Sequence, residues 1–206
     1  MNGNRFSSRD CEMHRAVFLD RDGTVNEEVG YLRDLADLQL IPGAGAAIKR
    51  LNDAGLKVVL VTNQSGVARG YFPESLVQEA HERLDQMLRR EGARIDAVYY
   101  CPHHPTAGNS SYTIVCDCRK PGTGLIDRAI RDLGIDVKQS YVVGDKWSDV
   151  ELGQRAGARS ILVRSGFAPD DAGNIRPKHI SDPDFIAHTI TEAAEWIIQR
   201  TSKDTV

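Results

Sequence analysis

The sequence predicts an α/β fold in which a parallel β-sheet lies between two layers of helices, the three-layer Rossmann-like architecture. The first observation is that short apolar segments alternate along the chain with longer segments of helical periodicity. The second is that polar side chains follow the ends of several apolar segments. In a parallel sheet these ends meet at one edge, where ligands bind.

The expected strands are short apolar runs. The first run stops at Asp20, and residues 57–61 are β-branched or apolar almost throughout, as in a strand that is buried on both faces. Each of the other runs is followed by polar or turn-forming residues. We therefore expect strands at residues 16–19, 57–61, 95–100, 141–143 and 160–163.

The expected helices have recognisable ends. One segment with apolar residues at helical spacing stops at Gly55, and another stops at Gly134. Pro73 suits the first turn of a long helix between them, because proline is tolerated there. We expect helices at residues 44–54, 73–90, 123–133, 148–156 and 187–199.

The chain length of 206 residues is enough for one domain with a core and at most a small insertion. We predict an N-terminal extension at residues 1–15, a single domain at residues 16–200 and a tail at residues 201–206. Residues 167–183, rich in Pro, Gly and Asp, are expected to form a surface loop. No segment suggests a dimerisation helix, so we expect a monomer.

The composition is that of a globular protein, with 41% hydrophobic and 27% charged residues and a formal net charge of -3. This balance argues against a nucleic-acid-binding surface, which usually shows a basic excess. No apolar run is long enough to span a bilayer, and residues 1–15 lack the apolar stretch of a secretory signal. We therefore expect a cytoplasmic protein with reduced thiols and a small-molecule partner.

A pair of carboxylates, Asp20 and Asp22, follows the first expected strand directly. Phosphoryl transfer needs one carboxylate to attack phosphorus and another to donate and accept protons, with a hard divalent cation to offset the charge. Gly23 permits the turn that aims the two side chains differently. A plain Asp-Gly turn explains this segment equally well when it is taken alone. A calcium loop fits less well, because Gly23 comes too early.

Three later segments supply partners for this pair. Thr62 and Asn63, followed by Gln64 and Ser65, end the second expected strand in a glycine turn whose N–H groups suit phosphate oxygens. The others are Lys120 before a helix, and Asp145 after the fourth strand with Asp149 four residues on.

In order and context these elements resemble the haloacid dehalogenase superfamily of phosphatases, over roughly residues 16 to 165. The resemblance implies that Asp20 is the nucleophile and a Mg²⁺ ligand, and that Asp22 is the general acid and base with a backbone carbonyl on Mg²⁺. It implies that Asp145 completes the Mg²⁺ site, supported by Asp149. Lys120 is expected to neutralise the phosphoryl group that Thr62 and Asn63 position.

Four thiolate and imidazole side chains flank a polar loop at residues 101–120: Cys101, His103, Cys116 and Cys118. A Cys₃His set is a closed, structural Zn²⁺ site, and we predict that it stabilises a loop too polar to fold alone. The cysteines could instead be ordinary buried thiols, and His104 could replace His103 as the ligand. The fourth cysteine, Cys11, stands apart.

Longer motifs narrow the resemblance. The segments DRDGT, TNQSGVARGY, CPHHP, CDCRKP and GDK together resemble the D-glycero-D-manno-heptose 1,7-bisphosphate 7-phosphatases, with the histidinol-phosphate phosphatases as close relatives. This family lacks a large cap domain. The resemblance implies hydrolysis of the C7 phosphate of the heptose bisphosphate, in the pathway to ADP-heptose and the lipopolysaccharide core. The substrate contacts that we predict on this basis are Glu28, Val29, Gly30, Tyr31, Thr62, Asn63, Gln64, Ser65, Arg119 and Lys146.

Arg119 is the expected partner of the second, non-reacting phosphate, because its guanidinium can bind two phosphate oxygens. Other readings are a phosphatase for histidinol phosphate or another small phosphomonoester, a phosphatase for nucleic-acid 3′-phosphate ends, and a non-enzymatic zinc module. The acidic balance argues against the nucleic-acid reading. The zinc-module reading leaves Asp20, Asp22, Lys120 and Asp145 without a role.

Overall fold

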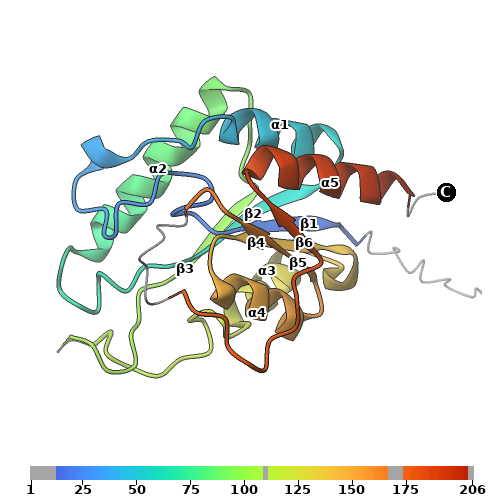
Figure 1. The fold of residues 1–206 in the computed structure, drawn as a ribbon. Coiled ribbons are helices and arrows are strands. Elements are labelled where there is room, and N and C mark those ends of the chain that lie inside the picture. The colour runs from blue at the N-terminus through green and yellow to red at the C-terminus, as the bar shows by residue number, and fades with distance from the viewer. Residues whose placement is uncertain (1–12, 109–110, 167–173, 204–206) are drawn as a thin grey trace, which may run out of the picture.

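A six-stranded parallel sheet forms the centre of the molecule in the computed structural model, which describes residues 13–108, 111–166 and 174–203 (Figure 1). The strand order is β3-β2-β1-β4-β5-β6, and every pairing is parallel. The strands are β1 (Ala16–Leu19), β2 (Lys57–Asn63), β3 (Ala97–Cys101), β4 (Tyr141–Gly144), β5 (Arg159–Val163) and β6 (Phe185–Ala187). This confirms the predicted parallel α/β class.

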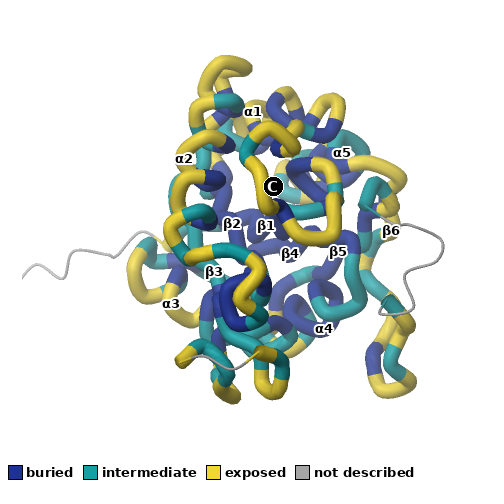
Figure 2. Tube along the Cα trace, turned by 90° about the vertical axis from the view of Figure 1, so that its left-hand side faces the viewer, coloured by how far each residue is buried: buried dark blue, intermediate teal, exposed yellow. Residues whose placement is uncertain are grey.

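Helices cover both faces of the sheet. The helices α1 (Ala44–Asp53), α2 (Glu74–Arg90) and α5 (Ile190–Lys203) pack on one face, and α3 (Gly124–Leu133) and α4 (Trp147–Ala156) pack on the other (Figure 1). Each face has its own apolar cluster, since alternate residues of one strand point to opposite sides. In β1, Val17 belongs to one cluster and Phe18 to the other. The residues of the central strands are consequently buried, and the exposed residues lie at the periphery (Figure 2).

The five predicted strands and five predicted helices are present, with shifted ends. The described residues also contain β6 and two short 3₁₀ helices, Leu35–Asp37 and Val137–Gln139, which were not predicted. A three-residue edge strand has too few residues to show a pattern, and β6 exists because it pairs with β5. The last helix begins at Ile190 rather than at residue 187, and it continues to Lys203, past the predicted domain end at residue 200.

Other predicted segments are described in part. Of the predicted surface loop, residues 174–183 contain no helix or strand, and residues 167–173 lie outside the described part of the chain. Most of the predicted extension, including Cys11, lies outside it as well. The division into extension, domain and tail stays a prediction. None of the helices in the described residues has the length and apolar character that a bilayer crossing needs.

The strand register brings the functional segments to one edge of the sheet. Leu19 is paired with Leu60 on one side and Val143 on the other, so the residues that follow these strands are neighbours. The backbone N–H of Asp20 donates to the carbonyl oxygen of Val143 over 2.9 Å, which continues the ladder into the site. The central place of β1 therefore puts Asp20 between the chain segments that follow β2 and β4.

Candidate active site and metal centre

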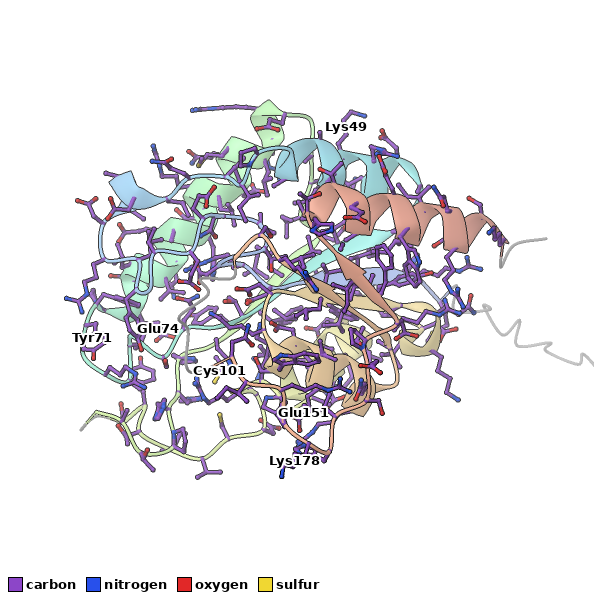
Figure 3. All side chains as sticks on the ribbon, viewed as in Figure 1. Lys49, Tyr71, Glu74, Cys101, Glu151 and Lys178 are labelled. Atoms are coloured by element: carbon purple, nitrogen blue, oxygen red, sulfur yellow. The ribbon has the colours of Figure 1, made fainter. Side chains whose placement is uncertain are left out.

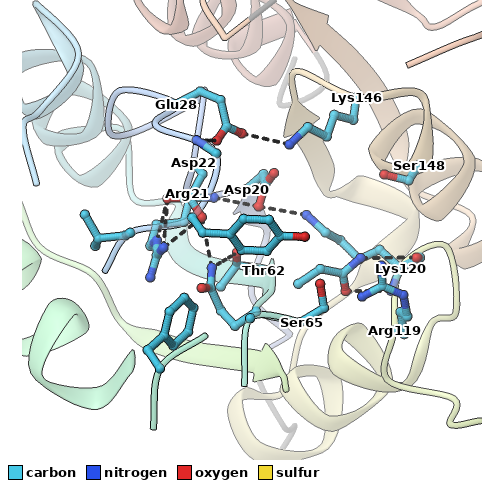
Figure 4. Close-up of a pocket in the computed structure, with 17 residues that line it drawn as sticks. Asp20, Arg21, Asp22, Glu28, Thr62, Ser65, Arg119, Lys120, Lys146 and Ser148 are labelled. Atoms are coloured by element: carbon cyan, nitrogen blue, oxygen red, sulfur yellow. Dashed lines mark hydrogen bonds and ion pairs between the residues drawn. The ribbon is translucent and has the colours of Figure 1, made fainter. Parts of the chain in front are cut away.

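A polar pocket of about 340 Å³ opens at this edge of the sheet (Figure 4). All the predicted substrate contacts line it except Val29, whose exposed side chain is not among the lining residues. The pocket is lined by Asp20, Arg21, Asp22, Glu28, Gly30, Tyr31, Leu32, Thr62, Asn63, Gln64, Ser65, Gly66, Phe72, Arg119, Lys120, Lys146 and Ser148. The predicted catalytic residues and nine of the ten predicted substrate contacts therefore share one cavity.

Three buried carboxylates meet beside the pocket. Oxygen atoms of Asp20, Asp145 and Asp149 lie within 4.8 Å of one another, and Oδ1 of Asp145 has no hydrogen-bond partner among the described residues. Burial, followed by the charge of Asp20, raises the pKa of Asp145 to about 8. Such crowding of hard oxygen atoms, one of them without a partner, fits a Mg²⁺ ion. The ligand role of the Asp22 carbonyl stays a prediction.

Gly23 allows the Asp145 carboxylate to approach the turn after β1. Its backbone has a φ of +79°, and a Cβ atom at this position would lie 2.3 Å from Oδ2 of Asp145. Any side chain here would be strained and would displace the carboxylate. Glycine at this position is therefore needed for the close approach of the Asp145 carboxylate, and not for the turn alone.

Lys120 occupies the space between two of these carboxylates. Its Nζ atom lies 2.8 Å from Oδ1 of Asp20 and 2.6 Å from Oδ1 of Asp149, and it donates to the carbonyl oxygen of Val61. Burial lowers the pKa of Lys120, but the charges of Asp149 and Asp20 outweigh it and the pKa is raised. Asn63 fixes the Lys120 backbone, because its side chain accepts from the Lys120 N–H and donates to the Lys120 carbonyl.

Asp22 is held by a set of donors. The Nε and Nη2 atoms of Arg21 donate to its carboxylate, and so do the side-chain amides of Asn26 and Gln64, each over 2.9 Å. Burial alone raises the pKa of Asp22, but the Arg21 charge and these hydrogen bonds outweigh it and the pKa is lowered. Gln64 also donates to the hydroxyl of Thr62, which ties Asp22 to the end of β2.

The pocket rim carries Lys146 and Glu28, whose side chains form an ion pair of 2.8 Å (Figure 4). Tyr31 contributes a ring that packs edge-on against Tyr71, with the ring centroids 4.7 Å apart. Arg119 donates from Nη1 to the carbonyl oxygen of His103 over 3.2 Å. The rim thus has two cationic side chains, Lys146 and Arg119, on different chain segments.

The predicted zinc ligands converge at the loop that leaves β3. Figure 3 labels the first of them, Cys101, which is the last residue of β3. The sulfur atoms of Cys101 and Cys116 are 3.6 Å apart, those of Cys116 and Cys118 are 3.3 Å apart, and Nδ1 of His103 lies 3.3 Å from Sγ of Cys118. Tetrahedral ligands of one Zn²⁺ ion at about 2.3 Å lie roughly 3.8 Å apart, so the cluster is consistent with a zinc site.

The structure distinguishes the two candidate histidines. The Nε2 atom of His104 lies 3.2 Å from Nη2 of Arg69, and His104 is not part of the cluster. Burial raises the pKa of the Cys101 and Cys118 thiols, so a cation is needed to hold both as thiolates at neutral pH. The geometry therefore favours His103, and the ordinary-thiol alternative loses support.

Three residues that were not predicted to have a role support Asp22. Arg21 and Asn26 donate to its carboxylate, and His81 contacts Arg21. His81 has a visible signal, because Val77, His81, Leu84 and Leu88 form the buried face of α2 at helical spacing. A histidine on such a face needs a buried polar partner. Arg21 and Asn26 have no comparable signal, since both belong to a polar turn.

Comparisons with known proteins identify the family of this chain. Residues 17–93 match a family model described as haloacid dehalogenase-like hydrolase, and residues 117–193 match a related hydrolase model of the same superfamily. The chain is 50% identical to the D-glycero-beta-D-manno-heptose-1,7-bisphosphate 7-phosphatase of Haemophilus ducreyi, over 75% of this chain and 85% of that protein. It is 46% identical to the corresponding phosphatase of Thermosynechococcus vestitus, over 88% of this chain and 94% of that protein.

A solved structure of a heptose bisphosphate phosphatase has a similar fold. The D,D-heptose 1,7-bisphosphate phosphatase of B. bronchiseptica, complexed with magnesium and phosphate, superposes with a TM-score of 0.77 at 30% identity. The match covers 90% of this chain and 99% of that one. The chain belongs to the D-glycero-D-manno-heptose-1,7-bisphosphate 7-phosphatase family of the haloacid dehalogenase superfamily.

Proposed function

We propose that this chain is a Mg²⁺-dependent phosphatase that hydrolyses the C7 phosphate of D-glycero-D-manno-heptose 1,7-bisphosphate. The observation that carries the proposal is the Asp20 carboxylate, which lines the pocket and lies beside Lys120, Asp145 and Asp149. The family relationship supplies the substrate. This reaction fits the pathway to ADP-heptose that the sequence motifs indicate.

The first chemical step that we propose is attack of the Asp20 carboxylate on phosphorus, which forms an aspartyl-phosphate and breaks the bond to the sugar oxygen. Asp22 donates a proton to that oxygen as it leaves. In the second step Asp22 takes a proton from a water molecule, which attacks the aspartyl-phosphate and releases inorganic phosphate. Asp20 returns to its carboxylate form.

The surrounding residues position the phosphoryl group. Lys120 places a positive charge beside Asp20, and Thr62 and the turn residues Ser65 and Gly66 line the same pocket. Mg²⁺ bound by Asp20, Asp145 and the Asp22 carbonyl would supply further positive charge against the phosphoryl oxygens. Zn²⁺ in the Cys₃His cluster would have no open position, so its role is structural.

The rim of the pocket supports a bisphosphate rather than a monophosphate. Arg119 and Lys146 line the same cavity as Asp20 but come from other segments. Lys146 already pairs with Glu28, whereas Arg119 donates to a backbone carbonyl oxygen. Histidinol phosphate has a single phosphate and would offer no second phosphate to Arg119. We further propose that the protein acts as a monomer in the cytoplasm, as the sequence indicates.

Asp20→Asn tests the chemistry, with the exposed Asp37→Asn as its matched control. We expect the first variant to lose turnover on every phosphomonoester and the second to retain it. Full turnover in Asp20→Asn would exclude the aspartyl-phosphate route. A comparison of kcat/KM on both anomers of the heptose bisphosphate and on histidinol phosphate tests the substrate, and a preference for histidinol phosphate would contradict the proposal.

A further inference from the structure

Behind the Asp22 carboxylate lies a buried arginine that the reaction as described does not use. The side chain of Arg21 is 2% exposed. Its Nη2 atom is 2.8 Å from both oxygens of Asp22, and its Nε atom is 3.0 Å from Oδ1. The guanidinium group therefore binds both oxygens of the carboxylate from one side. The orientation of the guanidinium group sets the orientation of the Asp22 carboxylate.

The remaining terminal nitrogen of Arg21 points away from Asp22 and towards α2. There, Nη1 lies 3.4 Å from Nε2 of His81. Arginine has only N–H donors, so Nε2 of His81 must act as the acceptor and the ring must be neutral. Burial, followed by the Arg21 charge, lowers the pKa of His81 to about 3, in agreement with a neutral ring.

The imidazole ring itself is held in place. His81 is 9% exposed and lies on the buried face of α2. The ring of Tyr100 from β3 packs at a tilt, 5.5 Å between centroids, and the Tyr100 hydroxyl donates to Oε1 of Glu74. A rigid helix and a strand thus determine where the acceptor for Arg21 lies.

We propose that His81 is a positioning residue for the general acid and base: by accepting a hydrogen bond from Arg21, it holds the guanidinium group on the Asp22 carboxylate. This inference rests on the proposed role of Asp22. Without His81, a buried N–H group of Arg21 would lose its acceptor, and the guanidinium would rotate to find another. Asp22 would then stay in the pocket but point less accurately at the leaving oxygen.

The test compares two substrates whose leaving groups differ in their need for a proton. An alkyl phosphate needs a proton from Asp22 in the first step, whereas p-nitrophenyl phosphate has a good leaving group and needs little help. In His81→Leu we expect kcat/KM on the sugar phosphate to fall about 10-fold and that on p-nitrophenyl phosphate to fall less than about 2-fold. His81→Gln offers an amide oxygen as acceptor and should restore most of the loss. The exposed His188→Leu is the control.

A double-mutant cycle asks whether His81 acts through Arg21. Arg21→Lys keeps the charge but lacks the planar fork, so His81→Leu should have almost no further effect in that background. An equal fall on both substrates, no recovery in His81→Gln, or a full loss in the Arg21→Lys background would each overturn the proposal.

A spectroscopic readout separates this inference from the proposed function. The ¹⁵Nε–H signal of Arg21 should exchange slowly with solvent in the wild-type protein and in His81→Gln, and faster in His81→Leu. Unchanged exchange in His81→Leu would show that His81 does not fix Arg21. The proposed role of Asp22 fails separately, if Asp22→Asn retains wild-type kcat/KM on the sugar phosphate.

Discussion

The Nζ atom of Lys120 lies 2.8 Å from Oδ1 of Asp20, and both side chains are almost fully buried. The pair joins the segment before α3 to the end of β1, 100 positions away in the sequence. Asp149 contacts the same ammonium group. In the described part of the chain, Lys120 is the only side-chain cation within 4 Å of the Asp20 and Asp149 carboxylates.

Replacement of Lys120 should damage both catalysis and stability. In Lys120→Met the Asp20 and Asp149 carboxylates stay buried without their partner, which should lower the free energy of unfolding by about 3 kcal/mol in Mg²⁺-free buffer. We expect kcat to fall at least about 100-fold. Urea unfolding and steady-state kinetics measure the two effects. Lys49→Met, at an exposed site, should change neither, and a wild-type kcat in Lys120→Met would contradict the proposed role.

The stability of the Mg²⁺-free protein should depend on Asp145. Its pKa is raised to about 8 in the folded chain, above the ordinary value of 3.8, so the folded state holds a proton that the unfolded chain has released. This contribution is present at acid pH and is lost as the pH rises towards 8. In Asp145→Asn we expect a melting temperature that falls less between pH 5 and pH 8.

Gel filtration into Mg²⁺-free buffer, which leaves the zinc in place, followed by melting curves at each pH, measures this effect. Added Mg²⁺ should stabilise the wild-type protein at pH 8 and leave Asp145→Asn unchanged, because only a binding-competent folded state gains from the ion. Equal stabilisation of both proteins would place the Mg²⁺ site elsewhere.

Arg119 should distinguish a bisphosphate from a monophosphate. If its guanidinium holds the second phosphate, Arg119→Lys should lower kcat/KM for the heptose bisphosphate about 10- to 100-fold, the range for a charge-assisted hydrogen bond. The effect on heptose 7-phosphate, which lacks the C1 phosphate, should be small. The control is Arg90→Lys, at the exposed end of α2. A similar loss on both substrates would mean that Arg119 acts at the reacting phosphate instead.

The Cys₃His cluster should hold about one zinc ion per chain, which metal analysis of protein purified without added metal will measure. Cys116→Ser should lose the ion and lower the melting temperature, with a smaller effect on kcat. Zinc retention should also decline at acid pH, since the thiols compete for protons. Cys11→Ser is the control and should keep the ion. Zinc-free wild-type protein, or unchanged melting of Cys116→Ser, would exclude the structural role.

The sequence predicted the features that depend on local pattern. Apolar runs and helical periodicity indicated the strands and helices. The geometry of a parallel sheet placed the residues that follow β1, β2 and β4 at one edge. Asp20, Asp22 and Asp145 could therefore be expected at one edge, and the resemblance to the haloacid dehalogenase phosphatases added Lys120 to this site. The Cys₃His set was equally visible, because its four members lie within one short loop.

Other features depend on contacts between distant segments, which no local pattern encodes. Strand β6 is too short to be recognised without its neighbour β5, and the choice of His103 over His104 required the positions of both rings.

By itself, then, the sequence determined the fold class and the residue types at the sheet edge, because periodicity and strand ends are local properties. Only the tertiary structure decided how those residues are held. Asn63 brackets the backbone of Lys120, and His81 on α2 reaches Arg21 across 60 positions of sequence. The physical reason is that a hydrogen bond depends on distance and angle in space, which the packing of helices on the sheet sets.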